Sequence, residues 1–160
     1  ALVADTTFCV AENPAANILA AHRAATLTLW NQSFGRFDGA DPLSNITAAA
    51  AGRAARTSCY GGAPCASVRL ARPLLDAMEA LRTRYGFRYF VTAIAGSSHA
   101  PNSYHYVGRA FDVDEVNGVR INGDSAAARA WMAACRALGA VEVFGPSNDP
   151  SHWDHLHCAF

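Results

Sequence analysis

The chain contains no lysine, and all 13 of its basic residues are arginine. Together with 34 alanines this is typical of a GC-rich genome and carries no functional information. Neither sign of charge is in excess, because the formal net charge is +0. This balance argues against a surface that binds nucleic acid or anionic membranes. Charged residues make up only 16% of the 160 residues and apolar residues 51%, which predicts one folded domain rather than a disordered chain.

The sequence also lacks any run of 18 or more apolar residues, so it predicts no transmembrane segment. A charged stretch followed by an apolar one is missing at its start, and we expect any signal peptide to have been removed already. The oligomeric state is not indicated by any pattern in the chain.

The five cysteines contain no C-x-x-C pair, which favours disulfides over a cysteine zinc site. Cys59 and Cys65 could close a turn-rich loop, and Cys135 and Cys158 could tie a helix to the last strand. Cys9 would then be left over, although a different pairing stays open. Disulfides predict a secreted, extracellular or periplasmic protein.

Helical patterns come first along the chain and strand patterns later, which predicts an α+β fold with a mostly antiparallel sheet. We expect a single domain over residues 1–160, with a helical N-terminal part at 1–66 and a metal-site core at 67–160. We expect residues 1–12 to form an N-terminal arm. The expected helices run from Pro14 to Trp30, over Asn45–Arg56 at the surface, from a Ser67 cap to Tyr85, and from Asp124 or Ser125 to Leu138. The expected strands cover 87–94, 109–116, 141–144 and 152–160.

Five of the six histidines lie in the last 62 residues, close to several aspartates. His105 and Asp112 are seven residues apart, and on an extended strand His155 and His157 would share one face. Nitrogen and oxygen ligands of this kind suit zinc, which in catalytic sites takes three protein ligands and a water. The spacing leaves open which of the last two histidines is the ligand. Asp154 and the remaining histidine are the groups available to take a proton from water.

Asp112 and Asp154 also have an alternative interpretation as purely structural residues that bind no zinc. Asp112 and Asp154 could cap turns or pair with Arg109 instead. Asp114, two residues beyond Asp112 on the same strand face, could accept a hydrogen bond from a ligating histidine.

At these residues the chain resembles the zinc metallopeptidases of the D-Ala-D-Ala carboxypeptidase type, which are related to phage endolysin peptidases and to the hedgehog signalling domain. Their pattern S-x-H-x-x-G-x-A-x-D is matched by Ser103, His105, Gly108, Ala110 and Asp112. The second family segment, ending in H-x-H or in E/D-x-x-H, is matched at 154–157. The likeness covers about residues 87–160.

The resemblance implies one zinc ion on His105, Asp112 and His157. It implies Asp154 as the general base, with His155 and His152 near the transition state. His99, Ser103 and Arg109 would contact the ligands or the substrate. The substrates implied are peptide bonds beside D-amino acids in bacterial cell-wall peptides, that is, peptidoglycan.

The alternative is a hedgehog-like zinc domain that binds a partner and hydrolyses little or nothing. His99 falls where hedgehog has an additional histidine, and His155-Leu-His157-Cys158 resembles that domain's own version of the second segment. Hedgehog lacks an acid at the Asp154 position, which favours a peptidase here. The family's carboxylate-binding arginine is missing near Gly96, so the choice between carboxypeptidase and endopeptidase stays open. Arg109 and Arg88 are the candidate substitutes for this cation.

Overall fold

The structure is a computed structural model that describes residues 12–160. Cys9 and nearly all of the predicted N-terminal arm therefore lie outside the described residues. Within these residues the four α-helices are α1 (Pro14–Arg23), α2 (Pro42–Ala50), α3 (Arg72–Thr83) and α4 (Ala126–Ala137). The strands are β1 (Thr28–Leu29), β2 (Ala55–Arg56), β3 (Ser67–Val68), β4 (Tyr89–Ala93), β5 (Ala110–Val116), β6 (Val119–Arg120), β7 (Glu142–Phe144) and β8 (Leu156–Ala159). Two 3₁₀ helices, η1 (Tyr104–Val107) and η2 (Pro150–His152), precede β5 and β8.

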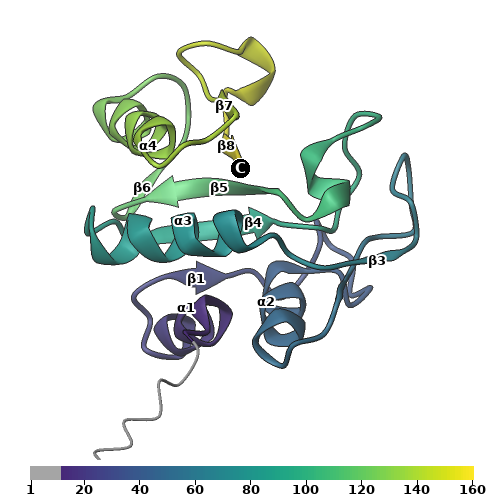
Figure 1. Ribbon diagram of the computed structural model, residues 1–160. Coiled ribbons are helices and arrows are strands. Elements are labelled where there is room, and N and C mark those ends of the chain that lie inside the picture. The colour runs from purple at the N-terminus through teal and green to yellow at the C-terminus, as the bar shows by residue number, and fades with distance from the viewer. Residues whose placement is uncertain (1–11) are drawn as a thin grey trace, which may run out of the picture.

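The strands confirm the predicted α+β fold with a mostly antiparallel sheet. The main sheet has the order β1-β4-β5-β8-β7, with β6 paired to β5, and only β1 pairs in parallel. Strands β2 and β3 form a separate two-stranded sheet. In Figure 1, α3 lies against the sheet, α1 and α2 lie on the side of β1, and α4 lies near β7 and β8. No helix within residues 12–160 is long and apolar enough to cross a membrane.

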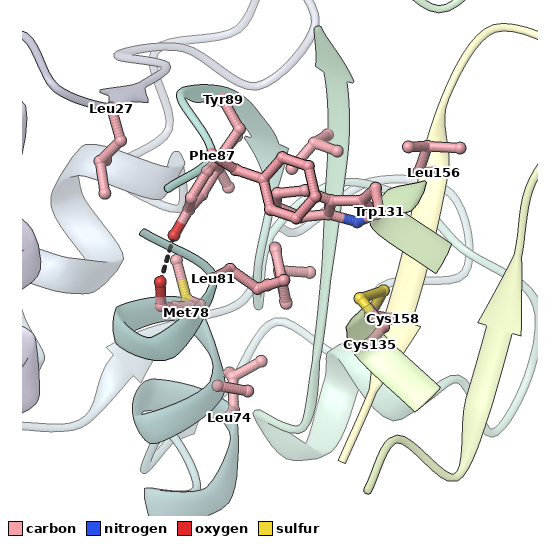
Figure 2. Packing of buried hydrophobic residues seen from close by; sticks show 14 of the residues in the cluster. Leu27, Leu74, Met78, Leu81, Phe87, Tyr89, Trp131, Cys135, Leu156 and Cys158 are labelled. Atoms are coloured by element: carbon pink, nitrogen blue, oxygen red, sulfur yellow. Dashed lines mark hydrogen bonds between the residues drawn. A yellow bond between two sulfur atoms is a disulfide. The ribbon is translucent and has the colours of Figure 1, made fainter. Parts of the chain in front are cut away.

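The helices cover one face of the sheet and form the core with it. Trp131 of α4 is fully buried, and its ring lies 4.7 Å from that of Tyr89 and 5.3 Å from that of Phe87. The Tyr89 hydroxyl donates a hydrogen bond of 2.6 Å to the Met78 carbonyl of α3, as Figure 2 shows. Since side chains alternate along a strand, the residues between these core positions point to the opposite face.

Both disulfide pairings that the cysteine positions suggested are present. Cys59 pairs with Cys65, and Cys135 of α4 pairs with Cys158 of β8. The second bond is buried in the core and ties α4 to the sheet (Figure 2). The first closes a loop whose two cysteines are exposed.

Two helix predictions in the N-terminal part were wrong. The first helix ends at Arg23. Leu27 and Leu29 are instead buried at alternate positions of an extended segment, which joins the sheet as β1. The second helix spans Pro42–Ala50 and is not a surface helix. Ile46 is fully buried, and the buried Asn45 side chain accepts a hydrogen bond of 2.8 Å from the Ala95 amide. Ile46 and the Asn45 amide therefore anchor this alanine-rich helix, and the partly buried Leu43, Ala49 and Ala50 also pack against the core.

Two element starts also differ from the predictions. Ser67 does not cap α3, because it pairs with Arg56 in the β2–β3 sheet. The helix instead begins at Arg72, where Pro73 favours a first turn. The last strand begins at Leu156 rather than His152, because Pro150–His152 forms η2.

Candidate metal centre and groove

The local sequence around His105 explains how this side chain is held. Ser103 caps η1 and accepts a hydrogen bond of 3.3 Å from the His105 amide. Gly108 ends η1 with a φ of +70°, and a Cβ there would lie 2.6 Å from the Arg69 carbonyl oxygen, so only glycine fits. The chain then enters β5 at Ala110, and the intervening turn aims the buried His105 ring at the strand.

Asp112 and His157 are brought together by the register of the sheet. They are direct cross-strand partners on β5 and β8, although 45 residues separate them. Both belong to the strand face opposite the helices, since their neighbours Phe111 and Cys158 are buried in the core. His157 Nδ1 lies 2.9 Å from Asp112 Oδ1.

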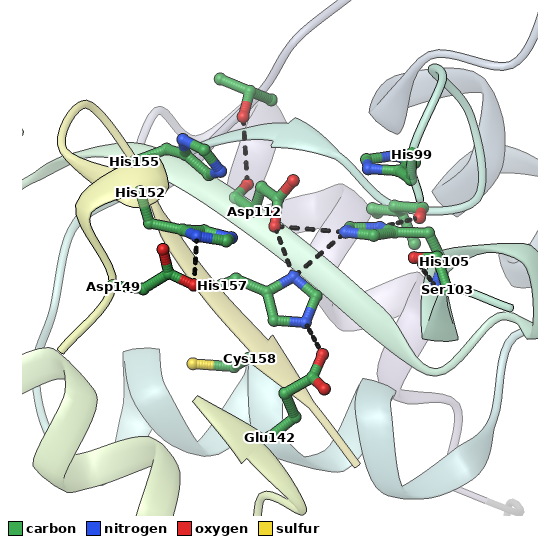
Figure 3. A network of polar contacts seen from close by, with 12 residues as sticks. His99, Ser103, His105, Asp112, Glu142, Asp149, His152, His155, His157 and Cys158 are labelled. Atoms are coloured by element: carbon green, nitrogen blue, oxygen red, sulfur yellow. Dashed lines mark hydrogen bonds and ion pairs between the residues drawn. The ribbon is translucent and has the colours of Figure 1, made fainter. Parts of the chain in front are cut away.

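Three polar atoms from distant segments converge at this point, as Figure 3 shows. His105 Nε2 lies 3.2 Å from His157 Nδ1 and 3.2 Å from Asp112 Oδ1. Together with the 2.9 Å contact between Asp112 and His157, these distances define a small triangle. All three side chains are almost completely buried.

In both histidine rings, the nitrogen that points away from the triangle has its own hydrogen-bond acceptor. His105 Nδ1 donates a hydrogen bond of 2.6 Å to the Ile94 carbonyl oxygen. A carbonyl only accepts, so the neutral ring carries its hydrogen on Nδ1 and turns the lone pair of Nε2 toward Asp112. His157 Nε2 donates in the same way to Glu142 Oε1 at 2.9 Å. Acceptors of this kind orient metal-binding histidines.

The three groups alter one another's proton affinity. Burial alone would raise the pKa of Asp112, but when the imidazoles are also protonated on the nitrogens that face it, the charge of His105 and the hydrogen bonds from His105 and His157 hold this pKa well below its usual range. Burial alone would lower the pKa of His157, but its hydrogen bond with Asp112 and the charges of Asp112 and Glu142 raise it. The triangle therefore favours an anion at Asp112 and a cation beside it.

His99 stands next to the triangle in the loop after β4. Its ring stacks on that of His105 with centroids 3.7 Å apart and planes 9° from parallel. Burial, followed by the charge of His105, lowers the pKa of His99 to about 4. Potential ligand atoms of His99, His105 and Asp112 all lie within 4.8 Å of one another, so this group could hold a metal ion.

Two of the remaining predicted residues near the C-terminus, Asp154 and His155, line an open groove of about 1240 Å³ that Asp112 of the triangle also lines, whereas His152 does not. His155 Nδ1 donates a hydrogen bond of 2.7 Å to Asp154 Oδ1, and both side chains line the groove. The rings of His152 and His155 lie 4.5 Å apart (Figure 3), and His152 pairs with Asp149 at 3.4 Å. Burial, followed by the charge of His155, lowers the pKa of His152.

Arg109 and Ser103 do not line this groove. The Arg109 guanidinium donates to the Phe160 carbonyl and lies 5.2 Å from the centre of the Tyr104 ring. Ser103 acts through its cap on η1. Arg88, the other arginine considered for a substrate carboxylate, donates to the Ala25 carbonyl at 2.8 Å.

Several residues around the triangle and in the groove were not predicted from the sequence. Glu142 accepts a hydrogen bond from His157 but does not line the groove. The available signal was its place among apolar residues in the predicted strand 141–144. The N-terminal part contributes an aromatic wall, made of Trp30, Phe34 and Tyr60, for which no sequence signal existed. Asp114 lines the groove but pairs with Arg120 at 3.0 Å rather than with a histidine.

Comparison with protein-family models, with curated proteins and with solved structures finds no match for this chain. The chemistry of the site is therefore argued from its own residues.

Proposed function

We propose that the protein is a zinc-dependent peptidase whose metal ligands are His105, Asp112 and His157. One observation carries the proposal: three ligand atoms on three segments lie 2.9–3.2 Å apart. A tetrahedral zinc ion with bonds of about 2.0 Å separates its ligand atoms by about 3.3 Å. Two lone pairs and a carboxylate oxygen facing one another at this range need a shared cation, either a proton or a metal.

The choice of His157 over His99 as third ligand follows from the ring planes. A histidine nitrogen binds a metal with a lone pair that lies in the plane of its ring. The rings of His99 and His105 are stacked, with centroids 3.7 Å apart and planes only 9° from parallel, so the two planes do not meet close to the rings. The planes of His105 and His157 meet at 61°, which allows both lone pairs to converge on one ion. His99 thus packs on a ligand rather than completing the set.

Zinc in a three-ligand site of this type supplies Lewis acidity, which polarises a carbonyl group and makes water nucleophilic near neutral pH. Asp154, about half exposed in the groove, accepts the proton of the attacking water. Its hydrogen bond to His155 holds the imidazole in the groove, where the ring stabilises the developing oxyanion. The His152 ring lies between those of His155 and His157, with centroids 4.5 and 5.9 Å away.

The groove supports a peptide substrate and suggests how its end is recognised. Among residues 12–160, Arg120 is the one arginine that lines the groove, and its side chain is 75% exposed. Asp114 holds one edge of the guanidinium, which leaves further N–H donors for a substrate carboxylate. We infer cell-wall peptides containing D-amino acids as substrates and, since disulfides persist in oxidising compartments, a location outside the cytosol.

The test is incubation of the zinc-loaded protein with purified peptidoglycan and with D-Ala-D-Ala peptides, followed by mass spectrometry of the products. Asp154→Asn is expected to keep zinc but to lower kcat by about 10²–10⁴-fold, the usual contribution of a general base. Asp124→Asn is the matched control, because Asp124 pairs with Arg129 away from the groove.

The outcomes separate the two functions. Product release by the wild type that disappears in Asp154→Asn supports the peptidase. Zinc and peptide binding without any product would instead support the binding domain of the hedgehog type.

Arg120→Ala tests the recognition of a carboxylate. Loss of a charge-assisted pair is expected to raise KM about 10-fold to 100-fold for peptides with a free C-terminus. Peptides with an amidated C-terminus should respond little to the same change. Arg129→Ala on α4 is the control. An equal response of free and amidated peptides would contradict the assignment and indicate an endopeptidase.

A further inference from the structure

The exposed disulfide Cys59–Cys65 closes a loop that touches the segment carrying His99. The Gly62 amide donates a hydrogen bond of 3.0 Å to Ser98 Oγ. At Gly61, where φ is +58°, a Cβ would lie 2.1 Å from the same oxygen, so a side chain at this position would displace the Ser98 hydroxyl. Just before the loop, Ser58 Oγ accepts a hydrogen bond of 2.9 Å from the Ser97 amide.

The contacts continue from this segment to the metal centre. His99 Nε2 donates a hydrogen bond of 2.9 Å to the Gly96 carbonyl, and the Tyr106 hydroxyl bonds both the amide and the carbonyl of His99, at 2.6 and 2.9 Å. These bonds fix the His99 ring against His105, which is a proposed ligand. Loop 59–65 therefore contacts the segment that carries His99, and His99 in turn contacts the proposed ligand His105.

The same loop also reaches the groove directly. Tyr60 lies between the two cysteines and lines the groove, with the Arg36 guanidinium 3.9 Å from the centre of its ring. Cutting the disulfide would remove the covalent link across a seven-residue segment that contributes a groove wall and supports His99. The ends of this segment would then be joined only by hydrogen bonds, such as that of 3.0 Å from the Cys65 amide to the Ser58 carbonyl.

The two disulfides differ in what a reductant can reach. Cys59 and Cys65 are exposed, whereas Cys135 and Cys158 are 0% and 1% exposed. Thiol–disulfide exchange requires access of the attacking thiolate to a sulfur atom. A small dithiol should therefore reduce the loop disulfide first and leave the core disulfide intact.

We propose that loop 59–65 is a positioning element for His99 and the groove, and that its disulfide makes the site sensitive to dithiol reductants. In the reaction an external dithiol supplies two electrons and two protons; the Cys59–Cys65 bond breaks, two thiols form, and the dithiol becomes a disulfide. The effect on zinc rests on the function proposed above, whereas the effect on the 97–99 segment does not.

The experiment compares oxidised protein, protein reduced at Cys59–Cys65 as verified by thiol alkylation and mass spectrometry, and the variant Cys59→Ser/Cys65→Ser. Amide hydrogen exchange at residues 97–99 is measured without added metal and is expected to be about tenfold faster once the disulfide is gone. The zinc dissociation constant is expected to rise about tenfold, the lower end of what loss of contacts behind a metal ligand costs. Ser98→Ala, which removes the acceptor for Gly62 and keeps both cysteines, should shift both quantities in the same direction.

Unchanged exchange at 97–99 in verified reduced protein would overturn the proposal, whatever the metal does. Absence of zinc binding by the oxidised wild type would count against the proposed function alone, and the exchange measurement would still decide the role of the loop. Faster exchange throughout the chain, including the buried strands, would also overturn it, since the disulfide would then support the whole fold rather than this segment.

Discussion

The two faces of the central sheet have opposite roles, although they are built from alternate residues of the same strands. On β5, Phe111 and Val113 pack into the helix-covered core, while Asp112 and Asp114 face the groove. On β8, Cys158 is bonded to α4 while its neighbour His157 contacts Asp112. The core face therefore holds the backbone in register, and this register places the polar groups of the other face.

This comparison predicts that changes on the two faces have separable effects. Substitutions on the core face should lower the free energy of unfolding before they affect the metal centre. Substitutions on the groove face should affect proton and metal affinity with less effect on folding.

Trp131→Ala on the core face should have the largest effect. Its fully buried ring contacts Phe87, Tyr89 and Phe111, and its removal leaves a cavity. The free energy of unfolding is expected to fall by about 3–5 kcal/mol, measured by urea denaturation. Trp153→Ala is the matched control, because Trp153 is 56% exposed. Equal losses for the two variants would break the distinction between the faces.

His99 tests the groove face through pH. Its pKa is lowered from 6.5 to about 4 by burial and by the charge of His105, so the unfolded chain takes up the proton first as pH falls. The depressed pKa therefore makes stability fall between pH 6.5 and about 4, by about 3 kcal/mol at most. His99→Gln should lose less stability than the wild type over this window, in denaturation series without added metal. Identical pH slopes would show that this histidine is not buried as the structure has it.

Glu142→Gln is expected to have the smallest effect of the three and to sharpen the comparison most. The carboxylate accepts a hydrogen bond of 2.9 Å from His157 Nε2 on the side away from Asp112. Replacing it with an amide is expected to raise the zinc dissociation constant about 10-fold to 100-fold, measured by competition with a chelator. Glu115→Gln is the control, a strand glutamate outside the triangle. A larger effect on unfolding than on zinc would assign Glu142 to the fold instead.

The sequence was informative where structure is local. Ser103, Gly108 and Ala110 determine a capped 3₁₀ turn, a left-handed residue and a strand start, so the chain between His105 and Asp112 was predictable from its residues. The dipeptide Asn117-Gly118 is likewise a strong local signal for a turn, and both residues form that turn with positive φ. The failures occurred where distant contacts override local preference, as at Ile46, which docks a helix predicted to lie on the surface.

What the sequence by itself determined is therefore the set of chemical groups and the alternation that puts Asp112 and His157 on the opposite side of their strands from the core. Only the tertiary structure decided that these two residues are cross-strand partners, that Glu142 and Ile94 orient the two imidazoles, and that loop 59–65 supports His99. The physical reason is that alternation and turns depend on neighbours in the chain. Register, tautomer and loop contacts depend on which distant surfaces pack together.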